Sequence, residues 1–433
     1  MRKLLTCCLL VCACVAGTNQ SFGQIIAGGF QRGVGGVSID AQGVLSAPTT
    51  VDQESLDAAR AAANLATPDQ FEKFEPLRAI SLKWLEETVA RCKAEGAPLP
   101  PEVECVGGLQ RIRYVFAYPE RNDIVLVGPA EGWQFDRLGN VVGKTTNLPV
   151  IMLDDLMAAL RSGPQSRVEA ITCSIEPTGE GLQRVQNLLS QMRTMGNPDE
   201  TADAIEDALG PQQIIVTGVP GSSHFARTLV AADFRMKRLA MNFEDAPISG
   251  LPSFLQMMSG RAKSLTPRWW LAPSYEPLAQ DADGLSWELR GAGVKCLTEN
   301  DYVAANGEKQ RTGQSDPLAA KWAKLMTEHY EELAAVDSTF GQLRNLMDLA
   351  VIGAIVDREQ MLERAGLSAP MLMGGQELVE LPAPTQTASK ASLLKKGRNW
   401  IVTASGGVEI LPWQVVENNV RESLADVRAQ FAK

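Results

Sequence analysis

The chain has 433 residues, 45% of them hydrophobic and 21% charged, and its formal net charge is −10. At roughly 100–200 residues per domain, this length and composition predict a globular protein of two or three domains with a sizeable core. The negative charge repels phosphate groups, which disfavours nucleic acid and anionic lipid surfaces as partners.

Residues 1–23 predict a secretory signal peptide. Arg2 and Lys3 precede an uncharged apolar run at 4–16, and small and polar residues follow it. These are the three parts of a cleavable signal, and the run is shorter than the about 20 residues that span a bilayer. We expect an exported protein, periplasmic or extracellular, without a transmembrane segment. A lipid anchor at Cys14 is the alternative, because residues 11–14 loosely resemble a lipoprotein signal.

After the signal, changes in composition and pattern predict five segments. They are a Gly-rich segment with a hairpin at 24–55, an α+β domain at 56–165, an α/β domain with a C-terminal helical pair at 166–365, a linker at 366–398, and a hairpin with a docking helix at 399–433. The fold class is therefore α+β or α/β, with a mixed sheet, packed helices and β-hairpins near both ends.

Turn residues between short apolar stretches predict three similar hairpins. They lie at 37–45, at 133–142 and at 400–410, the last turning at Gly406 and Gly407. A longer hairpin is expected from strands at 111–118 and 123–127. Ser81 is the expected cap of a helix that ends at Gly96, and a short helix is expected at 153–161.

The middle of the chain alternates between strand and helix patterns, which favours a mixed sheet. We expect strands at 168–175, 213–218, 268–272, 285–290 and 293–297, and helices at 181–195, 198–209 and 223–243. Further on, Asp316 and Pro317 open a helix that runs to 336, and Ser338 opens another. Their apolar stripes predict an antiparallel pair packed on the sheet. A last helix is expected at 416–431.

Four of the eight cysteines lie in the signal, and Cys92, Cys105, Cys173 and Cys296 remain. In an oxidising compartment an even number invites disulfides. A Cys92–Cys105 bridge would close a short loop and stabilise the chain by about 3 kcal/mol; the alternative is two buried thiols. Cys173 lies on the expected buried face of its strand, as a free thiol or as a partner of Cys296.

The turn before the helix at 223–243 is the best candidate binding site. A strand, a Gly-rich turn and a helix in this order point backbone N–H groups at an anion, and Ser222, Ser223, His224 and Arg227 stand at that junction. The phosphate-binding motifs GxxxxGK[ST] and GxGxxG are absent. The alternative is plain capping of the helix by one of the two serines.

Other site chemistries find little support in the sequence. The chain has two histidines, His224 and His329, and no CxxC or HExxH pattern, so we expect no metal site and no cofactor. Asp281–Gly284 begins like a calcium loop, but Ala292 stands where such a loop has its bidentate Glu. A simple turn is expected there.

Several stretches resemble a family of exported planctomycete proteins known only as a domain of unknown function. They are GLQRIRYVFAYPERNDIVLVGPAEGW at 108–133, SHFARTLVAADFRMKRLAMNFE at 223–244, RWWLAPSYEPL at 268–278, WELRGAGVKCLTE at 287–299 and FGQLRNLMDLAVIGAIV at 340–356. The resemblance spans 78–360. It implies a secreted or envelope location, and it brings no activity, cofactor or site residue.

We expect a non-enzymatic binding or assembly component of the periplasm or cell envelope, with another envelope protein or a second copy of itself as partner. The alternative is a hydrolase of envelope glycans or peptides, with Glu328, Glu331 or Asp348 as general acid and base. Two carboxylates ~5–10 Å apart across a cleft would favour the hydrolase, whereas a flat apolar patch would favour assembly.

Overall fold

The computed structural model describes residues 37–48, 65–192, 197–258, 267–303, 309–311, 315–375, 381–396, 398–402 and 404–432. The predicted signal at 1–23 and Cys14 lie outside these residues. The fold is α+β with mixed sheets, as the sequence predicts. Among the described helices, none is both long and apolar enough to cross a membrane.

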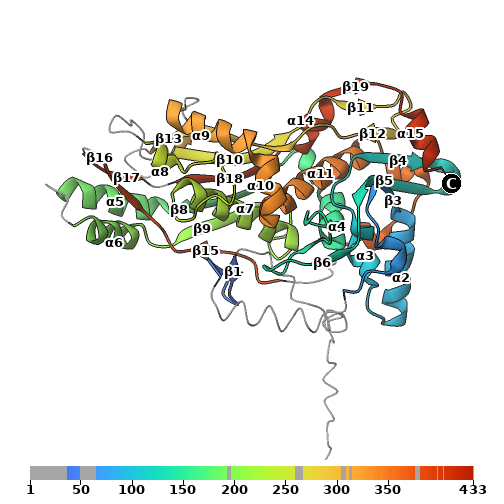
Figure 1. Cartoon of the computed structure of the whole chain (residues 1–433), viewed down its shortest axis with the longest axis horizontal. Coiled ribbons are helices and arrows are strands. Elements are labelled where there is room, and N and C mark those ends of the chain that lie inside the picture. The colour runs from blue at the N-terminus through green and yellow to red at the C-terminus, as the bar shows by residue number, and fades with distance from the viewer. Residues whose placement is uncertain are drawn as a thin grey trace, which may run out of the picture.

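A nine-stranded mixed sheet forms one half of the molecule (Figure 1). In spatial order its strands are β1 (Ser38–Ile39), β2 (Val44–Ser46), β15 (Gln386–Thr387), β9 (Gln212–Thr217), β8 (Ile171–Pro177), β18 (Ser405–Ile410), β10 (Pro267–Ser274), β13 (Gly293–Val303) and β14 (Lys309–Arg311). β2 runs parallel to β15 and β18 parallel to β10, and the other pairs are antiparallel. The sheet thus draws strands from both ends of the described chain.

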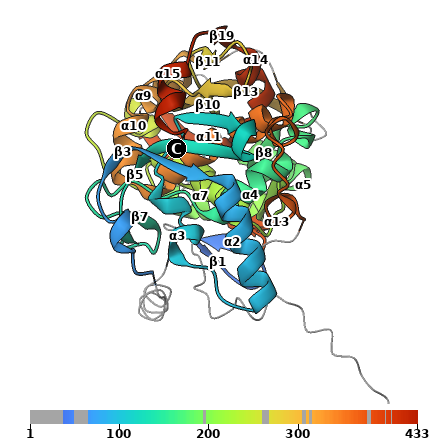
Figure 2. The same ribbon diagram turned by 90° about the vertical axis from the view of Figure 1, so that its right-hand side faces the viewer.

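A six-stranded sheet forms the other half, and in Figure 2 its β3, β4 and β5 face the viewer. In spatial order its strands are β19 (Asn419–Arg421), β11 (Leu278–Gln280), β12 (Ser286–Glu288), β4 (Tyr114–Tyr118), β5 (Asp123–Ala130) and β3 (Glu75–Ser81). Two small antiparallel pairs complete the strands: β6 (Trp133–Phe135) with β7 (Val141–Gly143), and β16 (Ser392–Lys396) with β17 (Arg398–Val402).

Helices lie around both sheets and between them (Figure 1). They are α2 (Leu82–Glu95), α3 (Pro101–Glu104), α4 (Leu153–Ser162), α5 (Gly179–Gln191), α6 (Pro198–Leu209), α7 (His224–Ala240), α8 (Phe254–Met257), α9 (Pro317–Glu328), α10 (Tyr330–Val336), α11 (Ser338–Arg358), α12 (Met361–Ala365), α13 (Pro370–Met373), α14 (Pro412–Glu417) and α15 (Ala425–Gln430).

Helix α11 is the centre of the core. Every residue from Ser338 to Val356 is buried, and the helix contacts α4, α7, α10 and α14. A helix that is buried on all sides needs partners on all sides. At Gly353 the backbones of α11 and α4 approach so closely that a Cβ would collide with the carbonyl of Ala159. The predicted helical pair is therefore present, but its second member lies between the two sheets.

The first helix of that pair is interrupted, because His329 leaves helical geometry and separates α9 from α10. α9 packs on β13 and β10. The hairpins expected at 37–45, 133–142 and 111–127 are confirmed as β1–β2, β6–β7 and β4–β5.

Two predictions for the C-terminal region are wrong. The hairpin expected at 400–410 does not form, because β17 pairs with β16 while β18 lies between β8 and β10. Gly406 and Gly407 stand inside β18, where a Cβ would collide with the carbonyls of Trp269 and Cys173. The helix expected at 416–431 is divided into α14 and α15, with β19 between them. In both places pairing with distant strands overrides the local pattern.

The Cys92–Cys105 bridge is also not formed. All four cysteines beyond the predicted signal are buried, and none of them forms a disulfide. Cys105 packs with Trp133, Val150 and Met152, a cluster of which Cys92 on α2 is not a member. The two thiols thus fill different parts of the interior, which was the alternative for this pair.

Candidate functional site

The candidate site is the turn that joins β9 to α7. Gly218 follows β9 with a φ of 79°, a conformation that glycine adopts without strain, and a Cβ there would lie 2.9 Å from the Cα of Ile171. Ser223 caps the helix, since its hydroxyl accepts the amide of Ala226 at 3.1 Å. The sequence left capping by a serine as the alternative to anion binding at this junction, and Ser223 is the capping residue.

The hydroxyl of Ser223 has a second partner, because it donates to the carbonyl of Pro220 at 2.6 Å. With both roles taken, Ser223 is a structural residue and not a free nucleophile. Ser222 is half-buried, and its carbonyl accepts the amide of Leu381 at 3.1 Å. The segment that leads to β15 therefore passes beside the turn.

His224 points away from the two serines and toward α4. Its Nδ1 lies 2.9 Å and 3.0 Å from the two carboxylate oxygens of Asp155, and both residues are buried. A carboxylate at Nδ1 fixes the ring orientation and holds a proton on that nitrogen. This contact joins the first turn of α7 to the first turn of α4.

Arg227 lies one turn into α7 and is 8% exposed. Among the described residues, no acceptor contacts its Nε and no carboxylate forms an ion pair with its guanidinium. Burial lowers the pKa of Arg227 to about 10. Side chains of a helix tilt toward its N-terminus, so this cation lies over the first turn.

The arrangement can hold an anion at the start of α7. The helix of 17 residues has the positive end of its dipole there, although Ser223 already accepts the amide of Ala226, and Arg227 adds a cation that has no counter-ion among the described residues. A planar guanidinium binds carboxylate or phosphate oxygens with two parallel hydrogen bonds. Bond-breaking chemistry has less support, because within the described part of the chain His224 is hydrogen-bonded to Asp155 and not to a serine hydroxyl.

The tertiary structure brings Asp155 to this site, and sequence reasoning missed it. The two partners stand 69 positions apart. The sequence indicates Asp155 only as an acidic residue in the first turn of a short helix, which is a common and unspecific pattern. Ser222, Ser223 and Arg227 meet at one helix end, as their neighbouring positions imply, whereas His224 turns to α4.

The carboxylates considered for a hydrolase lie in different environments. Glu328 and Glu331 are exposed, and Glu328 forms an i,i+4 pair with Lys324 at 3.6 Å. Asp348 is fully buried in α11. The two glutamates are therefore solvated residues of an exposed helix face, which is the alternative to a catalytic role.

Asp348 has both oxygens engaged. It accepts two hydrogen bonds from Arg111, each 2.9 Å long, and one from the hydroxyl of Tyr275 at 2.7 Å. Burial, and after it the charge of Asp348, raises the pKa of Tyr275 well above its usual value, so the phenol remains a donor. This carboxylate therefore has a structural role.

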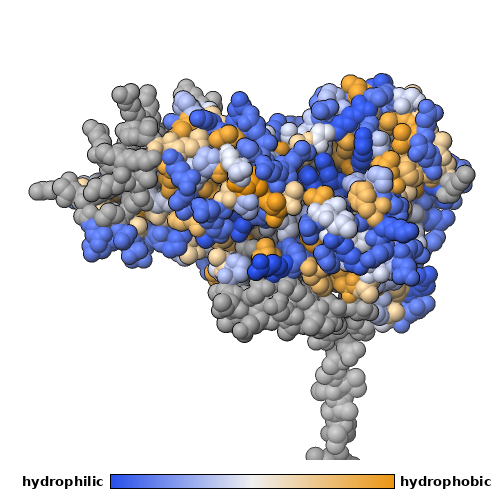
Figure 3. Space-filling model, viewed as in Figure 1, coloured by the Kyte–Doolittle hydropathy of each residue, from blue (hydrophilic) through white to orange (hydrophobic). Residues whose placement is uncertain are grey.

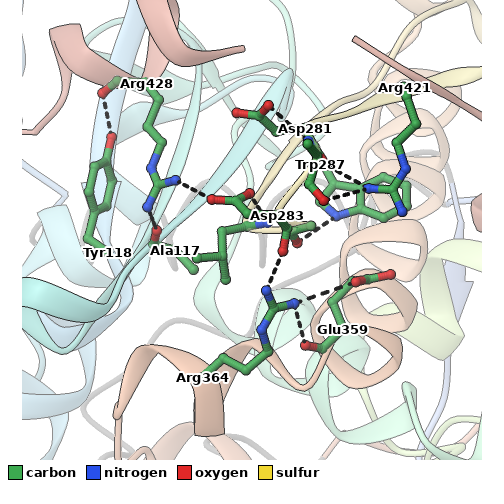
Figure 4. Close-up of polar contacts among 12 residues, drawn as sticks. Ala117, Tyr118, Asp281, Asp283, Trp287, Glu359, Arg364, Arg421 and Arg428 are labelled. Atoms are coloured by element: carbon green, nitrogen blue, oxygen red, sulfur yellow. Dashed lines mark hydrogen bonds and ion pairs between the residues drawn. The ribbon is translucent and has the colours of Figure 1, made fainter. Parts of the chain in front are cut away.

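The turn at Asp281–Gly284 is confirmed as a turn, closed by the bond from the amide of Gly284 to the carbonyl of Asp281 at 3.0 Å. Figure 4 shows arginines from three other elements pointing at it. Arg421 donates to the carbonyl of Asp281 at 2.7 Å, Arg428 pairs with the carboxylate of Asp283 at 3.1 Å, and Arg364 donates to the carbonyl of Asp283. Arginines thus occupy oxygens that a cation would need. Over the described part of the chain, no group of three His, Cys, Asp or Glu residues is arranged to hold a metal ion.

Comparison with known proteins identifies one family. A family described as a protein of unknown function (DUF1598) matches residues 173–254, which run from β8 through α7 to the first residue of α8. The candidate site lies inside this segment. No curated protein matches the chain, and no solved structure matches it.

Proposed function

We propose that this chain is an exported binding protein that takes an oxyanion at the first turn of α7. The single observation that carries the proposal is Arg227, a buried cation with no acidic partner among the described residues. Asp155, a buried carboxylate in the first turn of α4, is paired with His224. A bound anion would supply the missing negative charge.

The energetics favour a ligand over an idle residue. A buried ion without a counter-charge costs several kcal/mol even after the protein relaxes, and natural cores rarely keep one. An apolar side chain at this position would avoid that cost. The arginine is therefore expected where its charge is used, in the recognition of an anion.

Binding is a better description of the site than hydrolysis. The carboxylates proposed for the hydrolase are exposed or already engaged, and the hydroxyl of Ser223 is taken by capping. Assembly through a flat apolar patch has less support on the face in Figure 3, where hydrophobic residues lie in small groups among hydrophilic ones. Export remains part of the proposal, supported by the charge and apolar pattern of residues 1–23.

The test is thermal unfolding of the purified chain with inorganic phosphate or sulfate, for the parent protein and for Arg227→Met. The matched control is Arg91→Met, the same change at an exposed position on α2. We expect phosphate to raise the Tm of the parent and of R91M in proportion to the logarithm of its concentration. R227M should fold and show no such rise. An equal phosphate response in R227M and the parent would overturn the proposal, as would the absence of a response in the parent.

A further inference from the structure

A second polar feature lies far from α7 in the fold, at the edge of the six-stranded sheet. It is a cleft of about 480 Å³ between β3, β5, β12 and the segment that precedes β4. Cavities of this size hold small ligands or the end of a peptide. Neither the family match at 173–254 nor the site at the first turn of α7 includes these residues.

One wall of the cleft is cationic and comes from Arg111, Arg113 and Arg290. Two of these side chains are held in place. Arg111 is fixed by Asp348 at 2.9 Å, and Arg290 is fixed by Glu288 at 2.6 Å and by Glu422 at 2.8 Å. Arg113 is 57% exposed, and its Nε and Nη2 donate to one oxygen of Glu288 in two long hydrogen bonds of 3.4 Å each. The fixed arginines form a rigid wall, and Arg113 is the least tightly held of the three.

A fourth arginine, which is buried, lies behind this wall. Arg344 is 6% exposed and has no ion pair among the described residues. It lies beside Arg111, because a Cβ on Gly293 would come within 3.0 Å of Arg344 and 3.2 Å of Arg111. Asp348, the buried carboxylate beside the two, accepts hydrogen bonds from Arg111 and from Tyr275. Burial, then the neighbouring Arg111, lowers the pKa of Arg344.

The rest of the lining is apolar or acidic. Phe74, Pro76, Pro129 and Leu289 line the cleft, and Phe74 is 51% exposed although it is a large aromatic side chain. Glu276 and Glu288 lie in the lining beside the three arginines, and Asp348 and Glu422 pair with Arg111 and Arg290. Because the carboxylates balance the charge of the arginines, the cleft suits a ligand with a single carboxylate better than a phosphate dianion.

We propose that this cleft binds a peptide through its terminal carboxylate and the apolar side chain beside it. The carboxylate would accept hydrogen bonds from Arg113 and Arg111, and the apolar side chain would pack on Phe74 and the two prolines. Glu276 is exposed and would accept a peptide N–H. The side chain of an internal glutamate also carries a carboxylate, so it could bind the arginines in the same way. The experiment therefore compares a peptide with a terminal carboxylate and a peptide with an internal glutamate.

The experiment measures Kd by calorimetry for three acetylated tripeptides. One ends in Phe with a free carboxylate, one is the same peptide with a C-terminal amide, and one has an internal Glu before an amidated Phe. We expect the free carboxylate to bind about tenfold or more tightly than the amide, since hydrogen bonds between charged partners are stronger than those of a neutral amide. Equal binding of the internal-Glu peptide would assign the carboxylate to a side chain and overturn the terminal assignment.

Variants of exposed residues test the site without disturbing the core. Arg113→Gln should weaken the free-carboxylate peptide about tenfold, and Phe74→Ala should weaken it several-fold through lost apolar contact. Arg91→Gln is the matched control and should bind as the parent does. Unchanged affinity in R113Q, or no binding of any peptide by the parent, would overturn the proposal. R227M should bind the peptide normally, so failure at this cleft and failure at α7 are distinguishable.

Discussion

Helix α7 carries a buried cation near each end, and the fold treats the two differently. Lys237, near the C-terminal end, is 9% exposed and donates to Asp233 at 2.9 Å, to the carbonyl of Ile175 at 2.7 Å and to the carbonyl of Gly406 at 3.3 Å. Arg227, near the N-terminal end, is equally buried and has no partner for its charge among the described residues.

Lys237 is the structural cation of the two. Lys237 joins α7 to β8 and β18, and each of its three N–H donors has an acceptor. Such complete satisfaction is what a buried charge needs if it is to hold a fold together. Arg227 lacks it, so its removal should affect stability with the opposite sign.

The largest effect on stability is expected when the buried ion pair of Lys237 is broken. Asp233→Ala leaves Lys237 buried without its counter-charge, which should lower the free energy of unfolding by about 3–5 kcal/mol. Urea unfolding followed by circular dichroism measures it. The double variant Asp233→Ala with Lys237→Met should recover much of the loss, because the unpaired charge is then gone. A loss that persists unchanged in the double variant would show that packing, and not charge, is the cause.

Replacement of Arg227 should raise the stability of the fold instead of lowering it. Arg227→Met removes a desolvated charge and keeps most of the volume, so the unfolding free energy should rise by about 1–2 kcal/mol in phosphate-free buffer. The same urea experiment applies, with R91M as the control for the change of side chain. A marked loss of stability would mean that Arg227 has a structural partner, and the contrast along α7 would disappear.

The cap at the start of α7 comes next in size. Ser223→Ala removes the acceptor for the amide of Ala226 and should cost about 1 kcal/mol. Ser223→Asp offers a new acceptor and should restore most of the stability. If Ser223 were a nucleophile and not a cap, the aspartate would not rescue the thermal unfolding midpoint.

The smallest effect on stability is expected at an exposed ion pair outside the core. Glu328→Gln breaks the exposed pair with Lys324 and should change the unfolding free energy by about 0.5 kcal/mol or less. Equilibrium unfolding at low and at high salt measures it, and the difference should vanish at high salt. A large effect here would return Glu328 to consideration as a functional residue.

Much of the fold could be predicted from the sequence because its signals are local. The bounds of α6, the cap of α2 at Ser81 and the turn of the β4–β5 hairpin depend on neighbouring residues. The wrong predictions concern segments that pair with strands distant in the sequence. β18 is inserted between β8 and β10, and the expected final helix contributes β19 to the six-stranded sheet.

The candidate site divides in the same way. The sequence alone indicates that a Gly-rich turn enters a helix capped by serine, because glycine conformation and capping act within a few residues. The folded structure is needed to show that Asp155 reaches His224 and that Arg113 faces a cleft. It is also needed to show that Arg227 is buried without a counter-charge among the described residues. Burial and charge pairing depend on which surfaces meet, and residues far apart in the chain supply those surfaces.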